Sequence, residues 1–315
     1  MIGRSTAFRI VEQLIRRVCA FDAPVLIHGE TGTGKELAAR AIHYQGQRRA
    51  GPFVPVNCGA LPDQLIENEL FGHRRGAFTD AREDKPGLVE LAQGGTLFLD
   101  EIDALTPKAQ VTLLRFLQDQ QFRPLGGRRE ERANVRIIAA SNNDLERQVS
   151  TGGFRLDLLY RLKLLELVLP PLREREGDIE LLAEHFVTIA AARYNKRALP
   201  FDAATLAWFK RYSWPGNIRE LENLVHRGFL LADGELISIE TPKNIASHPG
   251  DWAPLNYRQA KTRAITDFEQ RFLSDLLDLA KGNVSEAARI SGTERRQLGR
   301  LLKKYGVAKT PSVGQ

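Results

Sequence analysis

The sequence has few cysteines and no long apolar segment. Only Cys19 and Cys58 occur among its 315 residues, too few for the disulfide framework of a small secreted protein. No run of 18 apolar residues could cross a bilayer, and the N-terminal MIGRSTAFRI lacks the apolar core of a signal peptide. These absences exclude a disulfide scaffold and membrane insertion. They predict a cytoplasmic protein in which Cys58, within an apolar stretch, is buried.

Internal repeats and low-complexity tracts are also absent. Apolar residues make up 43% of the chain and charged residues 27%, close to ordinary globular usage, which excludes a disordered or fibrous protein. The length predicts about two or three domains of roughly 100 to 200 residues each.

Positive charge is concentrated near the C-terminus. Residues 251–315 hold 12 lysines and arginines against 7 aspartates and glutamates, whereas residues 1–250 hold 33 against 32. A basic segment of this kind is typical of a protein that binds a polyanion such as DNA. A solvated basic surface without a partner is the alternative interpretation.

Short apolar runs alternate with amphipathic stretches through the first two thirds of the chain. Runs of strand length occur at 24–28, 53–57, 96–100 and 135–140, and each precedes a polar turn and a helical pattern. This alternation predicts an α/β fold in which helices cover a parallel sheet, over residues 1–170.

Strand signals stop near residue 177. Amphipathic segments at 178–194, 202–211 and 217–231 predict a helical subdomain over residues 171–240. The rest of the chain is expected to comprise a proline-containing linker at 241–256, an all-α domain at 257–308 and a flexible tail at 309–315.

A glycine-rich loop, GETGTGKE at 29–36, stands between the first apolar run and a helical pattern. Its glycines let successive backbone N–H groups point at phosphate oxygens, and the following helix adds its positive N-terminal end. Lys35 would supply charge to the outer phosphates, whereas Glu36 replaces the usual Ser or Thr that binds magnesium and could reach the ion through water. The expected nucleotide-binding residues are Gly29, Glu30, Thr31, Gly32, Thr33, Gly34, Lys35 and Glu36.

A second motif, TLFLDE at 96–101, ends an apolar strand with two carboxylates. Asp100 is expected to hold Mg²⁺, directly or through water. Glu101 is placed to orient and polarise the attacking water as a general base. The alternative is a solvated acidic turn. Together with the glycine-rich loop, this motif predicts an ATPase that converts ATP and water to ADP and phosphate.

These motifs resemble those of the bacterial enhancer-binding proteins, the AAA+ activators of sigma-54 RNA polymerase, and the resemblance covers nearly the whole chain. It implies a AAA+ P-loop ATPase with a helical lid, assembled as a homo-oligomeric ring, usually hexameric, with ATP between neighbouring protomers. The matching stretches are GETGTGKE, NCGAL at 57–61, ELFGHRRGAFTDA at 69–81, GGTLFLDEI at 94–102, FRLDLLYRL at 154–162, PPLREREGDI at 170–179 and WPGNIRELEN at 214–223.

The same resemblance implies roles for residues outside the glycine-rich loop. Arg155 and Arg161 match the fingers that reach the γ-phosphate of a neighbour. Asn142 matches a polar sensor of the γ-phosphate or water, and Arg219 matches a lid arginine that senses the bound nucleotide. Asn57 matches the residue that pairs with the catalytic glutamate and can hold it away from water. Each also has a structural interpretation, as a turn cap or a surface pair.

The segment GAFTDA at 76–81 matches the family loop GAFTGA, which contacts sigma-54 and remodels the closed promoter complex. An exposed Phe78 flanked by small residues fits a contact tip, although a core aromatic on a folded-back loop is the alternative. Asp80 replaces a glycine, which would allow a positive φ that aspartate tolerates less easily. The expected contact residues are Gly76, Ala77, Phe78, Thr79, Asp80 and Ala81.

The last helical segments resemble a Fis-type helix-turn-helix. Apolar residues at 258–280 have near-helical spacing, so this helix is expected to pack or dimerise. Ala287 and Ala288 allow close helix approach, Gly292 makes the turn, and Thr293 would N-cap the second helix. Donors suited to phosphates and guanine edges follow at Arg295, Arg296, Gln297, Arg300, Lys303 and Lys304, and a basic solvated helix is the alternative.

The sequence thus predicts an ATP-dependent transcription activator that binds promoter or enhancer DNA and remodels sigma-54 polymerase. Two other functions remain open. Asp80 favours a nucleotide-responsive DNA-binding regulator that acts with a polymerase containing another sigma factor. A general AAA+ remodeller of another protein is also possible, although it would have no obvious use for the helix-turn-helix. The chain starts almost at the ATPase domain, which implies either control by a regulatory protein in trans or a truncated chain.

Overall fold

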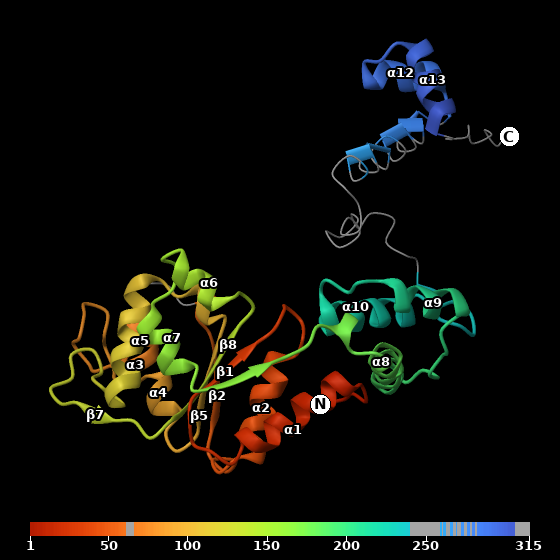
Figure 1. Ribbon diagram of the computed structural model, residues 1–315. Helices are drawn as coiled ribbons and strands as arrows, with labels where there is room; N and C mark the ends of the chain where they lie inside the picture. The colour runs from red at the N-terminus through yellow and green to blue at the C-terminus, as the bar shows by residue number, and fades with distance from the viewer. Residues whose placement is uncertain are drawn as a thin grey trace. The chain divides into compact units, whose positions relative to one another are not determined.

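The computed structural model describes residues 1–60, 66–239 and 282–305, with part of the segment 259–280. It divides into two compact units, Met1–Thr241 and Pro242–Gln315 (Figure 1). The predicted linker and C-terminal tail lie outside the described residues. Among the residues that are described, no helix combines the length and the apolarity that a membrane span requires.

The first unit is built on a five-stranded parallel sheet with the order β2-β5-β8-β1-β9. The register pairs Asn57 with Asp100 and His28 with Ser141, so the strands end together at one edge. Four of the five strands are predicted from the sequence, and β9 at the sheet edge is not. The strands are β1 (Val25–His28), β2 (Phe53–Asn57), β5 (Thr96–Asp100), β8 (Arg136–Ser141) and β9 (Leu165–Val168).

Side chains alternate along each strand between two apolar layers. In β5, Leu97 and Leu99 join one layer, whereas Phe98 joins the other. Helices α1 (Thr6–Val18) and α2 (Lys35–Gln45) cover the Phe98 face, and the opposite face is covered mainly by α3 (Ile66–Phe71), α5 (Pro107–Asp119) and α7 (Leu156–Leu162) (Figure 1). Smaller elements of this unit are α4 (Leu88–Leu91), α6 (Leu145–Ser150), the hairpins β3 (Gly72–His73) with β4 (Lys85–Pro86) and β6 (Gln121–Phe122) with β7 (Glu131–Arg132), and the 3-10 turns η1 (Cys58–Ala60), η2 (Ile102–Ala104) and η3 (Leu172–Glu174).

The lid consists of helices at the three positions that the sequence predicts, α8 (Asp178–Tyr194), α9 (Ala203–Arg211) and α10 (Asn217–Leu230). Its core is aromatic: the fully buried Trp214 packs against Phe209 and donates its indole N–H to the Phe209 carbonyl (3.0 Å). Trp214 and Asn217 both have positive φ, and the tight turn between them directs the start of α10 toward the glycine-rich loop at 29–36, the P-loop.

The second unit contains the predicted helix-turn-helix. Helices α12 (Val284–Ser291) and α13 (Arg295–Tyr305) meet at Gly292, whose φ of 64° closes the turn. Helix α13 begins at Arg295, two residues after the predicted cap Thr293, whose Oγ1 donates to the Ser291 carbonyl instead (3.4 Å). The expectation that the preceding segment packs is confirmed for four of its residues, Leu273, Leu276, Leu277 and Ala280. The common core includes Leu273, Leu276, Leu277, Ala287, Ala288, Leu298 and Leu302.

Candidate functional site

The P-loop curls tightly where β1 ends and α2 begins. Gly32 and Gly34 have left-handed φ values of 79° and 95°. A Cβ atom at Gly32 would lie 2.2 Å from the Gly216 carbonyl oxygen, so the lid approaches the loop as closely as backbone allows. Lys35 is buried, and its Nζ donates to the carbonyls of Gly29 (2.8 Å) and Glu30 (3.2 Å). The loop therefore holds a cation and the N-terminus of a helix at one point.

Burial lowers the pKa of Lys35, and three nearby carboxylates, of Asp100, Asp103 and Glu101, oppose this shift. Glu36 lies at the first turn of α2, where its carboxylate pairs with Arg40 (2.7 Å) and also lines the pocket next to the P-loop. Phosphate oxygens would meet a desolvated ammonium group here, which interacts more strongly than an ammonium in water.

Asp100 and Glu101, the two carboxylates of the TLFLDE motif, lie at the carboxyl end of β5. Glu101 has a left-handed backbone, with φ 53° and ψ 46°, which costs a non-glycine residue about 1 kcal/mol. Its N–H donates to Asp100 Oδ1 (3.0 Å), and burial raises the pKa of Asp100. Such strain persists where surrounding structure imposes it and is common at functional sites.

Asn57 lies beside Glu101 across Gly59. A Cβ atom at Gly59 would be 3.0 Å from Glu101 Oε2 and 3.3 Å from Asn57 Oδ1. The side-chain carbonyl of Asn57 already accepts from the N–H groups of Gly59 (2.8 Å) and Ala60 (3.2 Å). Within the described residues no hydrogen bond joins Asn57 to Glu101, although the two side chains lie next to each other.

Most of the residues predicted to bind or hydrolyse ATP line one pocket of about 220 Å³. The sensor candidate Asn142 joins it from the end of β8, where its Nδ2 donates to Thr31 Oγ1 (3.2 Å). Its Oδ1 is buried without a hydrogen-bond partner in the described part of the chain. The lining residues are Thr31, Gly32, Gly34, Lys35, Glu36, Leu37, Asp100, Glu101, Asn142, Ile218, Arg219 and Glu222.

The lid closes one side of this pocket. Ile218 N–H donates to the Gly32 carbonyl (3.0 Å), which fixes the first turn of α10 on the P-loop. Arg219 follows directly and lines the pocket, as expected for a lid arginine that senses a nucleotide. The sequence-predicted residues from the P-loop, the two strand ends and the lid are thus brought together.

A second, more apolar pocket of about 250 Å³ adjoins the P-loop, and the sequence did not predict it. The N-terminal segment before α1 forms one wall because Asp178 of α8 accepts from the backbone N–H groups of Arg4 (2.6 Å) and Ser5 (3.0 Å). Arg175 links the two by donating to Asp178 and to the Ile2 carbonyl. The sequence signal for this pocket lay in the stretches IGRS and LREREGD, which carry the hydrogen-bond donors and the carboxylate that meet here. The lining residues are Met1, Ile2, Phe8, Thr33, Gly34, Leu37, Arg175, Leu182, His185, Phe186 and Ile218.

The predicted finger residues Arg155 and Arg161 do not line the nucleotide pocket of their own chain. The Arg155 guanidinium is exposed and pairs with Asp157 (2.7 Å), which raises the pKa of the arginine. Arg161 donates to the carbonyls of Leu117 (3.3 Å) and Gln118 (3.1 Å) at the end of α5. Both arginines lie at helix α7, so a molecule that contacts this helix could meet both side chains.

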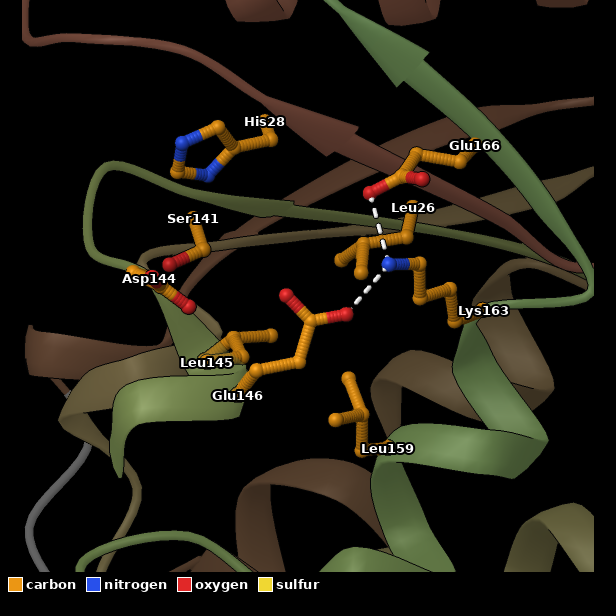
Figure 2. Close-up of a pocket in the computed structure, with 9 residues that line it drawn as sticks. All are labelled: Leu26, His28, Ser141, Asp144, Leu145, Glu146, Leu159, Lys163 and Glu166. Carbon is orange, nitrogen blue, oxygen red and sulfur yellow. Dashed lines mark hydrogen bonds and ion pairs between the residues drawn. The ribbon is translucent and has the colours of Figure 1, made fainter. Parts of the chain in front are cut away.

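A third pocket, of about 160 Å³, lies behind the ends of β1 and β8 (Figure 2). Lys163 crosses it to pair with Glu146 of α6 (2.5 Å) and Glu166 of β9 (3.1 Å). Lys163 therefore links the end of α7 to α6 and β9. The described residues contain no cluster of three or more side chains suited to holding a metal ion.

The GAFTDA loop projects from the β3–β4 hairpin. Phe78 is 43% exposed, and its ring packs on His73 with centroids 4.9 Å apart, so it is neither a core residue nor unsupported. A Cβ atom at Gly126 would lie 2.8 Å from Ala77 Cβ, which places the β6–β7 hairpin against the loop. Asp80 is exposed and avoids positive φ, so its backbone carries none of the strain that its replacement of glycine would lead one to expect.

Helix α13 presents its predicted DNA-binding residues to solvent. Leu298 and Leu302 are buried in the domain core. The six predicted donors lie at other positions of the helix and are all exposed: Arg295, Arg296, Gln297, Arg300, Lys303 and Lys304. One helix thus separates a packing face from a cationic surface, the arrangement that a recognition helix requires.

Three segments of the chain match known families. Residues 1–168 match the sigma-54 interaction domain, residues 173–251 the AAA+ ATPase lid domain, and residues 264–305 the Fis family of bacterial regulatory proteins. The matches follow the division into sheet domain, lid and helix-turn-helix that the structure shows.

Full-length relatives agree with these matches. The response regulator protein PilR of Pseudomonas aeruginosa is 41% identical over 311 residues, covering 98% of this chain and 70% of PilR. The phenol regulator MopR of Acinetobacter guillouiae is 42% identical over 311 residues, 96% of this chain but 56% of MopR, so the chain spans little more than half of that protein. The crystal structure of NtrX from Brucella abortus with ADP is 34% identical, with a TM-score of 0.73 over 98% of this chain and 69% of NtrX. The chain belongs to the bacterial enhancer-binding proteins, the AAA+ activators of sigma-54 RNA polymerase, and carries their Fis-type helix-turn-helix.

Proposed function

We propose that this chain hydrolyses ATP and uses the reaction to activate transcription by sigma-54 RNA polymerase at promoters to which its helix-turn-helix binds. The observation that carries the proposal is the convergence of Lys35, Asp100, Glu101, Asn142 and Arg219 on one pocket. These residues come from four separate segments, and each has a role in phosphoryl transfer to water. The crystal structures of NtrX with ADP and with ATP support a nucleotide as the ligand.

In this proposal the phosphates lie against the P-loop amides and Lys35, and the adenine base occupies the apolar pocket lined by Ile2, Phe186 and Ile218. Asp100 and, through water, Glu36 would hold Mg²⁺, because hard oxygen ligands beside phosphates suit this ion. Bound there, the ion would neutralise charge on the phosphate oxygens.

The remaining residues act on the attacking water and on the leaving phosphate. Glu101 accepts the proton of the water, and the side chain of Asn142, which lines the same pocket, helps to hold that water. Lys35 and Arg219 bring positive charge to the transferring group. Asn57, beside Glu101, limits the positions that this carboxylate can take before a nucleotide is bound.

The hydrolysis proposal is tested with the purified chain and two variants. Glu101→Gln keeps the size of the side chain, so it should bind ATP and turn it over at least about 100-fold more slowly. Glu12→Gln, an exposed residue paired with Arg16 on α1, is the matched control and should hydrolyse ATP at the parent rate. Parent-like turnover by Glu101→Gln would remove Glu101 from the role of general base.

Assembly into a ring would complete the site with Arg155 and Arg161 of a neighbouring protomer, which lie outside the pocket of their own chain. Mixing Lys35→Ala protomers with Arg155→Ala protomers then creates some interfaces with both groups intact. Each variant alone should be inactive, and the mixture should recover part of the ATPase rate. A mixture as inactive as its components would mean that Arg155 does not act in trans.

The role in transcription is carried by the exposed Phe78. Phe78→Ala should hydrolyse ATP normally but fail to support open-complex formation by sigma-54 holoenzyme. Phe21→Ala, which removes another exposed phenylalanine (59% exposed), is the control and should activate transcription. The match to the sigma-54 interaction domain covers the whole Asp80 loop, and this favours sigma-54 over another sigma factor. Equal activity of the parent with another holoenzyme would contradict the proposal.

DNA binding is assigned to the exposed cations of α13. Substituting Arg295 and Arg300 with alanine should weaken DNA binding and reduce the slope of log K against log salt by about 0.9 for each phosphate that is no longer neutralised. Arg289→Ala on α12, whose guanidinium pairs with Glu286 (2.6 Å), is the control. Promoter occupancy unchanged by the double substitution would favour a remodeller that acts on another protein.

A further inference from the structure

The turn that follows the two catalytic carboxylates holds a third one, Asp103, in η2. Its Oδ1 accepts a hydrogen bond from Ser141 Oγ (2.8 Å), and its Oδ2 accepts one from Asn143 Nδ2 (2.6 Å). Asp103 does not line the nucleotide pocket. Its hydrogen bonds therefore go to the loop at the end of β8 and not to the pocket lining.

The two partners of Asp103 stand on either side of the sensor candidate Asn142. Ser141 is fully buried at the end of β8, and its Oγ also lies 3.1 Å from the Asn143 N–H and 2.8 Å from the Asn143 carbonyl. A hydroxyl has one hydrogen, and the bond to a carboxylate is stronger than the bond to a carbonyl. Ser141 therefore donates to Asp103 and accepts from Asn143, which closes a ring of three hydrogen bonds.

Asn142 lies between Ser141 and Asn143 in the chain, but its side chain takes no part in the hydrogen-bonded ring. Its own side chain reaches the P-loop through Thr31 Oγ1 (3.2 Å) and leaves Oδ1 in the pocket wall. The position of that oxygen is set by the backbone of the residues on either side. Asp103 fixes both of them, and it belongs to the same turn as Glu101, whose carbonyl accepts the Ala104 N–H (2.9 Å).

We propose that Asp103 is a positioning residue for ATP hydrolysis. It holds the loop 141–143 against the turn that carries Asp100 and Glu101. The Asn142 amide and the Glu101 carboxylate therefore stay at a fixed distance from each other and contact the same water. The inference rests on the proposed ATPase function. It places no new group on the substrate, so it concerns turnover and leaves ATP binding unchanged.

The test compares kcat and KM for ATP in purified Asp103→Ala, Asn142→Ala and the double variant. Asp103→Ala should lower kcat about tenfold, because a small misplacement of a catalytic group has effects of this order or larger, and KM should stay within about twofold. Adding Asp103→Ala to Asn142→Ala should lower kcat no further, since the group that Asp103 positions is already gone. Parent-like kcat in Asp103→Ala, or effects that multiply in the double variant, would overturn the proposal.

A folding defect is distinguished by rescue. Asn143→Asp places two carboxylates together and should lower kcat by repulsion, whereas Asn143→Asp combined with Asp103→Asn restores one amide and one carboxylate and should recover most of the rate. Asp233→Ala, an exposed aspartate in the lid, is the control and should match the parent. Failure of the swap to recover activity, with melting temperatures unchanged, would count against the positioning role. If the parent itself hydrolyses no ATP, the proposed function fails instead.

Discussion

The guanidinium of Arg173 donates two hydrogen bonds to the carboxylate of Glu30, at 2.9 and 2.6 Å. Glu30 is the second residue of the P-loop, and Arg173 lies in η3, where the chain enters the lid. Asn217 of α10 also donates to the same carboxylate (3.1 Å) and to the Thr31 carbonyl (3.0 Å). One P-loop side chain is thus held by both the start of the lid and its last helix.

Loss of this connection should weaken nucleotide binding more than it weakens folding. Arg173→Ala removes two bonds to the P-loop, so we expect the affinity for ADP to fall several-fold, measured by fluorescence titration. The pair is about half exposed, so its contribution to stability is at most about 1 kcal/mol. Arg16→Ala breaks an exposed pair with Glu12 on α1 and should leave affinity unchanged. Equal ADP affinity in both variants would show that Arg173 does not hold the P-loop through Glu30.

The N-terminal segment and the lid should separate as Asp178 is protonated. Burial by itself raises the pKa of Asp178, but hydrogen bonds from Arg4, Ser5 and Arg175 outweigh it, so the pKa lies below the ordinary value. A depressed pKa gives stability that is complete above the pKa of the unfolded chain and is lost as pH falls through the lower, folded value. Unfolding midpoints in urea should therefore stay constant from pH 7 to about pH 5 and fall as the pH is lowered further.

Asp178→Asn isolates this effect. The substitution leaves the Arg175 guanidinium buried without its counter-ion, so we expect the free energy of unfolding at neutral pH to drop by about 3 kcal/mol. The remaining pH dependence should be shallower than that of the parent, because the titrating group is gone. Identical slopes in parent and variant would mean that other carboxylates account for the acid sensitivity.

The sequence predicts the parts of the nucleotide site that depend on local chemistry. Gly32, Lys35, Asp100 and Glu101 belong to contiguous motifs next to strand-length apolar runs, and such patterns report their own surroundings. The lid helices are predicted for the same reason, because their apolar faces repeat at helical spacing. The domain order follows from these segments and needs no long-range information.

What the sequence does not predict depends on contacts between distant segments. The edge strand β9 has four residues and follows α7 within the apolar run LKLLELVL, so periodicity alone cannot separate it from the helix. The apolar pocket beside the P-loop requires Asp178 to meet Arg4, 174 positions away, and the hydrogen-bonded ring at the end of β8 requires Asp103 to meet Ser141. An acidic residue in a turn does not indicate which of many donors it will bind.

Both thiols should be unreactive in the folded chain. Cys19 and Cys58 are 5% and 3% exposed, and burial followed by the charges of Asp100, Asp103 and Glu101 raises the pKa of Cys58 to about 12. Because the thiolate is the reactive form, a disulfide reagent near pH 8 should label neither cysteine, and both should react in urea. Ser150→Cys, at an exposed helix end, is the positive control. Rapid labelling of the parent without urea would contradict the burial of these residues.

Gly292 and Gly299 of the helix-turn-helix allow the effect of backbone conformation on stability to be compared at two sites. A Cβ atom at Gly299 or at Gly292 would meet nothing within 4 Å, so neither substitution is opposed by packing. Gly292 has a φ of 64°, whereas Gly299 lies inside α13. Alanine should therefore stabilise at position 299 by about 1 kcal/mol and destabilise at position 292 by a similar amount.

Amide hydrogen exchange in α13 of the full chain measures this difference locally. At about 1 kcal/mol, exchange of the α13 amides should slow about fivefold in Gly299→Ala and quicken about fivefold in Gly292→Ala. DNA affinity at fixed salt provides the functional comparison. A more stable α13 loses less conformational entropy when Arg295, Arg296 and Arg300 bind DNA. Gly299→Ala should bind somewhat more tightly than the parent. Slower exchange with weaker binding would mean that the open space at Gly299 is where DNA approaches the helix.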